Sequence, residues 1–137
     1  MNGRAFIDTN VFLYAHDEHN KKKRAIARDL VFTLYKTGDS VVSTQVLAEF
    51  FQNFAGKFKL SYADALKELH FMSRCKVVEQ SLSLLLAGVS LYNEHSISFW
   101  DSMIIAAAIE AEAEILYSED LNHGQLFHGV KVINPFE

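Results

Sequence analysis

The chain has 137 residues, half of them hydrophobic, and its 13 Lys and Arg against 17 Asp and Glu give a formal net charge of −4. This length predicts a single domain over residues 1–137, and this composition excludes a disordered chain, which is typically poor in hydrophobic residues. The longest apolar run, 103–109, is far shorter than the roughly 20 residues that span a bilayer, so we expect a cytoplasmic protein without membrane contact. The single cysteine, Cys75, excludes an internal disulfide and a cysteine-based metal site, and we expect it to be a small core residue.

The predicted elements alternate between short apolar strands and helical patterns. In chain order we expect a strand at 5–8, a helical stretch at 11–16 that resumes over 21–38, a strand at 40–43, helices at 44–58 and 61–72, a strand at 76–80, helices at 81–95 and 98–113, and strands at 114–118 and 130–134. No strand has a polar face of period two, which indicates a mostly parallel sheet covered on both sides. The expected fold class is α/β, a three-layer α/β/α sandwich.

Four acidic residues lie at or near the ends of these predicted strands. Asp8 closes the first strand, and Asp120 follows the fourth with one residue in between. Glu49 lies in the helix after the second strand, and Asp101 lies near the start of the apolar helix at 98–113. Because ligands of parallel α/β sheets bind beyond the carboxyl ends of the strands, we expect these carboxylates to converge on one rim.

Each acid also has a purely structural interpretation. Asp8 could cap a helix, Asp101 fits a capping box at its helix start, and Glu49 could face water on a polar helix side. Asp120 could be an ordinary turn residue, and Glu119 is equally well placed to be the relevant acid. Taken one at a time, the residues leave these alternatives open.

The four acids together favour a metal site. Two unit charges about 4 Å apart repel by about 1 kcal/mol in water and by nearer 4 kcal/mol at an effective dielectric constant of ~20. Crowded carboxylates at a partly buried rim must therefore take up protons, separate or bind a cation. Oxygen ligands without cysteine or a suitably placed histidine favour Mg²⁺ or Mn²⁺ over zinc.

Four segments carry a resemblance to a known family. They are FIDTNVFLYA, STQVLAEF, WDSMIIAAA and ILYSEDLNHGQ, in this order and spread over nearly the whole chain. Together they resemble the PIN-domain ribonucleases, particularly the VapC-like toxins of bacterial toxin–antitoxin pairs. The resemblance implies a five-stranded parallel sheet and a Mg²⁺- or Mn²⁺-dependent endoribonuclease that acts on single-stranded or looped RNA. It also implies a homodimer that is held inactive by a small antitoxin protein.

The resemblance also implies roles for individual residues. The family's catalytic acids fall on Asp8, Glu49, Asp101 and Asp120. Asn10 and Ser118 fall on polar positions that orient those acids, although the family more often has threonine where this chain has Ser118.

As a hypothesis, Asp8 and Asp101 hold the principal metal ion, Asp120 completes the site, and Glu49 positions the attacking water or a second ion. The number of ions is left open. An alternative is a catalytically silent PIN-like module that binds RNA or protein, against which the four intact acids argue.

Basic residues and histidines have alternative interpretations as well. The run Lys21, Lys22, Lys23 and Arg24 could hold an RNA backbone or could simply be a solvated helix start. His16 and His19 are interpreted as part of a polar loop. For His123 and His128, which flank the loop of the last acid, a substrate contact is the weaker alternative to a structural role.

Overall fold

Six strands form one sheet at the centre of the molecule. The computed structural model describes residues 3–57 and 61–137. Its strands are β1 (Ala5–Ile7), β2 (Ser40–Ser43), β3 (Lys76–Val78), β4 (Ile115–Tyr117), β5 (Leu126–Phe127) and β6 (Val130–Ile133). The order across the sheet is β3-β2-β1-β4-β6-β5, and every neighbouring pair is parallel except β5 with β6. The α/β class and the mostly parallel sheet are thus confirmed.

The sheet has one strand more than the five that were expected. The five predicted strands correspond to β1, β2, β3, β4 and β6, and the sixth is the two-residue edge strand β5. A strand this short carries no recognisable sequence period, and it forms because the chain turns back at His128–Gly129 to pair with β6.

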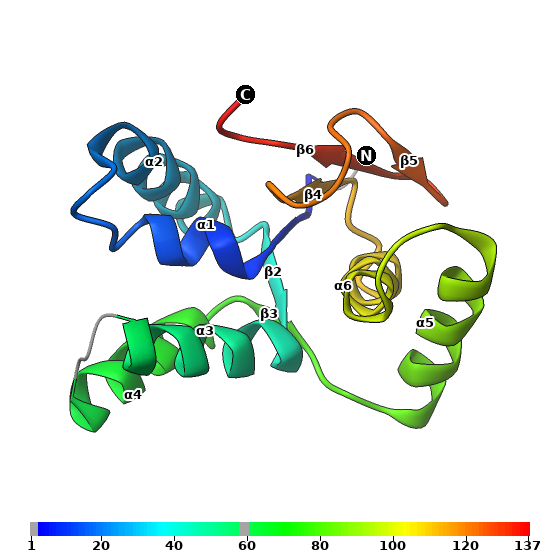
Figure 1. Cartoon of the computed structure of the whole chain (residues 1–137), viewed down its shortest axis with the longest axis horizontal. Helices are drawn as coiled ribbons and strands as arrows, with labels where there is room; N and C mark the ends of the chain where they lie inside the picture. The colour runs from blue at the N-terminus through cyan, green and yellow to red at the C-terminus, as the bar shows by residue number, and fades with distance from the viewer. Residues whose placement is uncertain (1–2, 58–60) are drawn as a thin grey trace.

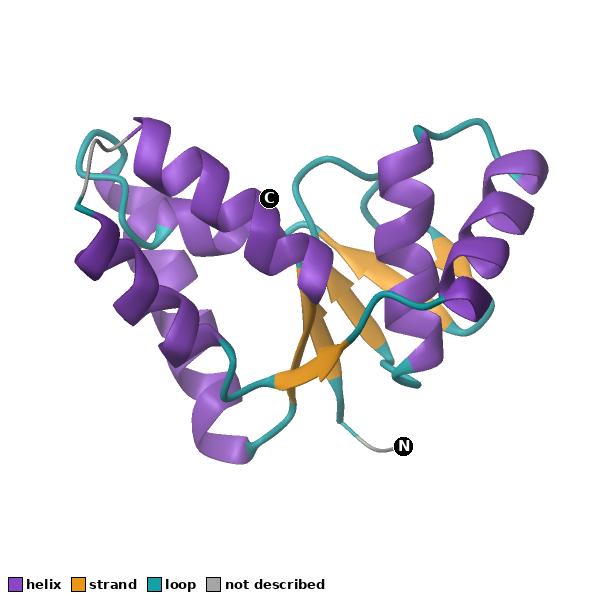
Figure 2. Ribbon diagram, turned by 90° about the horizontal axis from the view of Figure 1, so that it is seen from below, coloured by secondary structure: helices purple, strands orange, loops and turns teal. Residues whose placement is uncertain are grey.

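Helices cover both faces of the sheet, as Figures 1 and 2 show, with α1–α4 on one side and α5 and α6 on the other. They are α1 (Thr9–Tyr14), α2 (Lys21–Thr37), α3 (Thr44–Lys57), α4 (Tyr62–Met72), α5 (Leu82–Glu94) and α6 (Phe99–Glu110). Residue 58, where the predicted third helix ends, lies outside the described residues. Within the described ranges, no helix is both long and apolar enough to cross a membrane.

The core lies between these layers. Phe6 and Ile7 of β1 and Leu116 of β4 are fully buried, as expected for central strands covered on both faces. Helix α6 is buried along residues 102–108 and packs against α5, where Gly88 leaves room for the side chain of Met103. This packing sets the position of the first turn of α6, which carries Asp101.

The strand order reverses between β1 and β4. The chain runs outward through β1, β2 and β3 on one side, and β4 returns to pair with the opposite edge of β1. Such a reversal creates a crevice at the carboxyl ends of the two central strands. Asp8 follows β1 directly and Ser118 follows β4 directly, so both lie at this crevice.

Candidate functional site

Asp8 is held at the carboxyl end of β1 by hydrogen bonds of its amide and of its carboxylate. The register pairs Ile7 with Tyr117, and the Asp8 amide donates to the Tyr117 carbonyl at 3.0 Å. Its carboxylate oxygens accept one bond each, Oδ1 from the amide of Thr9 at 2.7 Å and Oδ2 from the Ser118 hydroxyl at 2.8 Å. The first of these makes Asp8 the N-cap of α1, so the structural role foreseen for this residue exists alongside its place at the crevice.

The Asp8 carboxyl is buried, with 5% of the residue exposed. Burial raises its pKa to about 6, and the negative charges of Asp120 and Glu49 add to the rise, while the bonds from Ser118 and Thr9 oppose it. Since no basic side chain of the described residues is among the causes of the pKa shift, Asp8 is a carboxylate that a cation would stabilise.

Glu49 and Asp101 reach the crevice from helices. Glu49 projects from α3, where its Oε1 accepts a hydrogen bond from the Thr9 hydroxyl at 3.1 Å. Asp101 lies in the first turn of α6, and its amide donates to the hydroxyl of the N-cap Ser98 at 3.1 Å. Burial raises the pKa of Asp101, and the nearby charge of Asp120 raises it further.

The two acids after β4 have different surroundings. Asp120 accepts a hydrogen bond from the Asn10 side-chain amide at 2.7 Å, and its own amide donates to the Ser118 hydroxyl at 3.2 Å. Glu119 instead pairs with Lys23 and accepts from the Tyr14 hydroxyl at 3.0 Å. Asp120 therefore lines the crevice, and Glu119 belongs to a separate contact that joins β4 to α1 and α2.

All four acids line one small cavity of about 90 Å³. Its lining comprises Asp8, Thr9, Asn10, Gln45, Glu49, Asn53, Trp100, Asp101, Ile104 and Asp120. The acids come from the end of β1, from α3, from α6 and from the turn after β4. Sequence positions more than a hundred residues apart thus meet at the strand-order reversal.

The four carboxylates line one cavity, but no three of them have ligand atoms that all lie within 4.8 Å of one another. In residues 3–57 and 61–137, the one group of three or more acidic, His or Cys side chains whose ligand atoms all lie within 4.8 Å is elsewhere, at Glu94, His95 and His128. Mutual repulsion keeps uncompensated carboxylates apart. Mg²⁺ takes one or two carboxylates directly and retains several waters, so an all-oxygen cavity of this kind fits a partly hydrated hard cation.

Several residues of this cavity were not selected as site residues from the sequence. Thr9 bonds to Glu49, and Gln45 donates to the Trp100 carbonyl at 3.2 Å, which links α3 to the start of α6. Trp100 is 62% exposed and lines both the acidic cavity and an adjoining groove between α3, α5 and α6. In the sequence, Trp100 could be noticed only as an apolar residue beside Asp101 at a helix start. The folded structure shows that its side chain faces solvent.

The basic run at the start of α2 divides into two kinds of side chain. Lys21 and Lys22 are exposed. Lys23 is held by Glu119 and the Tyr14 hydroxyl, with its ammonium 5.2 Å from the centre of the Phe136 ring. Lys23 therefore has a structural partner, and none of the basic residues 21–24 lines the acidic cavity.

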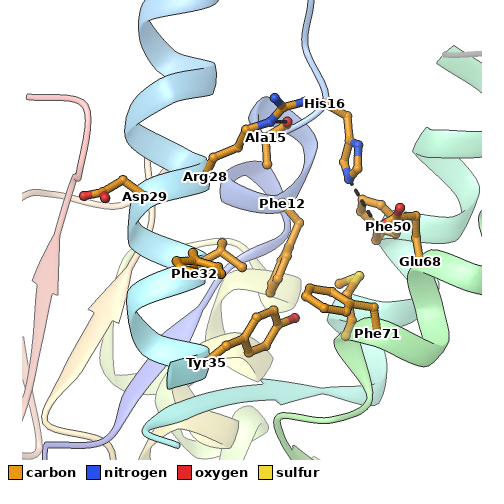
Figure 3. Close-up of a pocket in the computed structure, with 12 residues that line it drawn as sticks. Phe12, Ala15, His16, Arg28, Asp29, Phe32, Tyr35, Phe50, Glu68 and Phe71 are labelled. Carbon is orange, nitrogen blue, oxygen red and sulfur yellow. Dashed lines mark hydrogen bonds and ion pairs between the residues drawn. The ribbon is translucent and has the colours of Figure 1, made fainter. Parts of the chain in front are cut away.

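A second, apolar groove of about 600 Å³ lies between α1, α2, α3 and α4 (Figure 3). Phe12, Phe32, Phe50 and Phe71 line it. His16 is also at this groove, where it pairs with Glu68 at 3.4 Å instead of lying in a purely polar loop. Phe32 is 59% exposed, so part of this apolar surface is open to solvent.

Similarity to known proteins is found both in the sequence and in the fold. The PIN domain family matches residues 5–126. A comparison of the sequence with curated proteins found no match.

Solved structures with a similar fold include a toxin–antitoxin complex from Klebsiella pneumoniae, with a TM-score of 0.72 and 19% identity, covering 97% of this chain and 98% of that one. VapBC2 from Rickettsia felis, bound to a DNA fragment from its promoter, has a TM-score of 0.66 and 21% identity, covering 93% and 96%. VapC20 from Mycobacterium tuberculosis, a toxin that cleaves the sarcin-ricin loop, has a TM-score of 0.65 and 16% identity, covering 85% and 89%.

These likenesses extend over most of both chains, and the family match runs from β1 to the start of β5, including all four acids of the cavity. The fold, the strand-order reversal and the acidic cavity agree with that match. The chain belongs to the PIN domain family.

Proposed function

We propose that this protein is a divalent-metal-dependent endoribonuclease that hydrolyses phosphodiester bonds in single-stranded or looped RNA. The observation that carries the proposal is the meeting of Asp8, Glu49, Asp101 and Asp120 around one small polar cavity. A silent binding module would gain nothing from the repulsion among these acids, which adds to the effect of burial in raising the pKa of Asp8.

The ion, Mg²⁺ or Mn²⁺, would be held by Asp8, Asp101 and Asp120, with Glu49 beside them. The ion would neutralise charge on the phosphate and make a water molecule more acidic.

Asn10 and Ser118 act as positioning residues, because they donate hydrogen bonds to Asp120 and Asp8 at the cavity. Glu49, held by the Thr9 hydroxyl, is the proposed acceptor of the proton that the attacking water loses.

The groove beside the cavity favours a nucleic acid with unpaired bases. Trp100 presents an exposed indole ring where the groove meets the acidic cavity, and unpaired bases stack on such rings. Tyr62 is also exposed but lies at the start of α4, outside the cavity lining. Lys21 and Lys22 are the exposed cations of the basic run that could contact the RNA backbone.

We also propose an antitoxin partner, because two of the structurally similar proteins are toxins in complex with antitoxins. The open apolar groove between α1, α2, α3 and α4 offers a docking surface for the apolar face of a partner helix. Arg28 and Asp29 at the same groove would give that partner a polar rim to match.

The nuclease proposal is tested by RNA cleavage with paired substitutions in one helix. Purified Asp101→Asn protein should cut a hairpin RNA with an unpaired loop at least about 100-fold more slowly than wild type, because a metal-holding charge is lost. Glu110→Gln, at the exposed far end of α6, is the matched control and should cut normally. Circular dichroism would show that both variants remain folded.

Two further comparisons separate the proposal from its rivals. Wild-type cleavage should stop in EDTA and return with Mn²⁺, whereas Glu119→Gln should retain activity and Asp120→Asn should lose it. Cleavage that continues in EDTA, or equal rates for Asp101→Asn and wild type, would contradict a metal-dependent nuclease. RNA binding without any cleavage would favour the silent binding module.

A further inference from the structure

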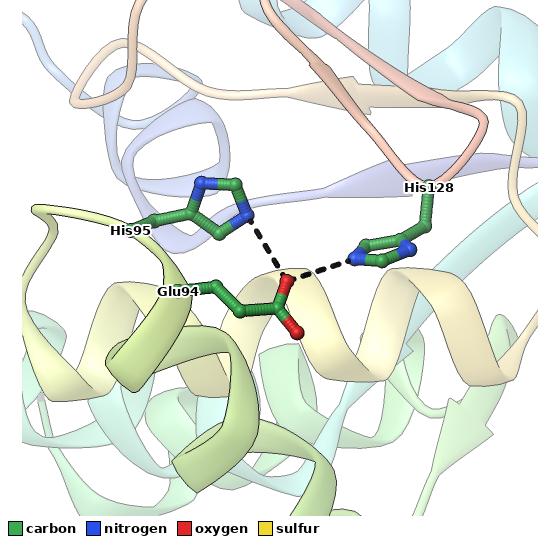
Figure 4. Close-up of side chains that lie close together, drawn as sticks. All are labelled: Glu94, His95 and His128. Atoms are coloured by element: carbon green, nitrogen blue, oxygen red, sulfur yellow. Dashed lines mark hydrogen bonds and ion pairs between the residues drawn. The ribbon is translucent and has the colours of Figure 1, made fainter.

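A second cluster of metal-binding side chains lies at the end of α5, away from the acidic cavity. Glu94 is the last residue of α5, and His95 is its C-cap. His128 comes from the two-residue turn between β5 and β6. Figure 4 shows the two imidazole rings on either side of the Glu94 carboxylate. None of these three residues lines the acidic cavity.

The spacing of the ligand atoms is close to that of a tetrahedral metal site. Glu94 Oε2 lies 3.4 Å from Nε2 of His128 and 3.7 Å from Nε2 of His95, and one ligand atom from each residue lies within 4.8 Å of the others. Ligands at about 2.1 Å from a tetrahedral ion are roughly 3.4 Å apart. Two of the three separations are therefore already close to that value, and the third lies within 4.8 Å.

The ring of His95 packs against an aromatic residue of β5. Its ring stands edge-on to Phe127, with the ring centres 4.9 Å apart. Its Nε2 atom is buried and has no hydrogen-bond partner among the described residues. A buried imidazole nitrogen without such a partner is costly, and a metal ion beside Glu94 would satisfy it.

His128 occupies a backbone position that other residue types fill more easily. Its φ is 49°, and that of the following Gly129 is 90°, which are the left-handed values of a tight hairpin turn. Asn, Asp and Gly are preferred at such a position. The turn aims the imidazole of His128 at Glu94 across the gap between the hairpin and α5.

We propose that Glu94, His95 and His128 form a binding site for one divalent transition-metal ion of the zinc class, with water completing the coordination. Two imidazole nitrogens and one carboxylate oxygen suit Zn²⁺, whereas Mg²⁺ and Mn²⁺ prefer the all-oxygen cavity. The chain would then carry two chemically different metal sites. This inference goes beyond the proposed nuclease function and does not depend on it.

Bound metal would join the end of α5 to the β5–β6 hairpin. Only two residues separate His95 from Ser98, the N-cap of α6, so the same link would also restrain the segment that leads into that helix. Because the unfolded chain does not bring these ligands together, the ion should stabilise the folded protein. The melting temperature should rise with Zn²⁺ concentration.

The test is Zn²⁺ binding to the full-length, tag-free chain, measured by competition with a coloured chelator. The measurements use the Asp8→Asn background, so that the acidic cavity contributes least. One ion should bind per chain, and His128→Asn and Glu94→Gln should each weaken binding by at least about 10- to 100-fold. Asn is well tolerated at a left-handed turn position, so His128→Asn should keep the hairpin intact.

The matched control is His19→Asn, which removes an exposed loop histidine and should leave Zn²⁺ affinity and the melting shift unchanged. Mg²⁺ at the same concentration should produce neither the binding signal nor the melting shift in this background. Absence of Zn²⁺ binding, unchanged affinity in both cluster variants, or an equal loss in His19→Asn would overturn the proposal.

Discussion

Asp8 combines three roles that usually fall on separate residues. It follows β1 directly, caps α1 and lines the acidic cavity, and the Ser118 hydroxyl after β4 donates a hydrogen bond to its second oxygen. Its burial and the charges of Asp120 and Glu49 raise its pKa to about 6. At neutral pH the protein without metal therefore keeps a charged carboxylate in an unfavourable place, and a cation removes that cost.

We predict that Asp8→Asn stabilises the metal-free protein in a pH-dependent way. The folded pKa of Asp8 lies above its unfolded value, so the folded state holds the proton more tightly, and stability from this group is lost as pH rises from about 4 to 6. The neutral amide that replaces the carboxyl in the variant has no such loss. The gain from the substitution should be small at pH 4 and approach about 3 kcal/mol at pH 7.

Urea unfolding of both proteins in EDTA, at pH 4 and pH 7, measures this difference. The other acids are common to both proteins. The change with pH in the stability difference between the two proteins therefore reports on Asp8 and on the charges beside it. Added Mn²⁺ should stabilise wild type more than the variant, because only the carboxylate attracts the ion. A stability difference that stays constant over this pH range would show that Asp8 is not held in a charged, unfavourable state.

At the level of elements, the contact between α5 and α6 places the acidic cavity. Gly88 of α5 faces Met103 of α6, and a Cβ added at Gly88 would lie 2.1 Å from the Met103 sulfur. The close approach lets α6 lie buried along its length, with Asp101 at its exposed first turn. The helix itself was predictable from its apolar run, but its closeness to α5 depends on a glycine that sequence periodicity does not explain.

Gly88→Ala should therefore destabilise the protein although alanine favours helices. Helix propensity contributes about 1 kcal/mol in favour of alanine, while overpacking of a buried contact costs about 1–3 kcal/mol. Gly56→Ala in α3 is the matched control, since nothing lies within 4 Å of a Cβ there, and it should be neutral or slightly stabilising. Thermal unfolding of both variants checks the prediction, and an equal gain in both would contradict tight packing at Gly88.

At the level of the whole molecule, one outer face remains apolar. Leu82, Leu86, Val89 and Tyr92 recur at helical spacing on α5 and are between 46% and 72% exposed. A soluble protein rarely leaves such a stripe uncovered, because contiguous apolar surface promotes association. We propose that this stripe is where two copies of the chain meet, which is the homodimer implied by the family resemblance.

The dimer proposal predicts that wild type sediments as a dimer and that Leu86→Glu shifts it to a monomer. A charge in the middle of a buried self-complementary interface is placed in both copies at once, which doubles its effect. Leu126→Glu, at an exposed leucine of β5, is the matched control and should remain dimeric. A monomeric wild type, or a dimeric Leu86→Glu, in analytical ultracentrifugation would rule out this interface.

The order of the elements and the parallel sheet were predictable from sequence, because buried strands are continuous apolar runs and the first polar residue after each run marks its end. Asp8 illustrates this, since it follows Ile7 of β1 immediately. Capping also has a local signature, and Ser98 caps α6 at the helix start where Asp101 indicated a capping box. These features depend on neighbours within a few residues.

Contacts between distant parts of the chain were decided only by the tertiary structure. The sequence did not distinguish Glu119 from Asp120 as the last acid of the site. In the structure, Glu119 pairs with Lys23, whereas Asp120 accepts a hydrogen bond from Asn10. The two-residue strand β5 and the approach of His128 to Glu94 likewise arise from a hairpin folding back on a helix more than thirty residues away. A side chain's partner across such a separation is set by how the layers pack, and local periodicity carries no information about it.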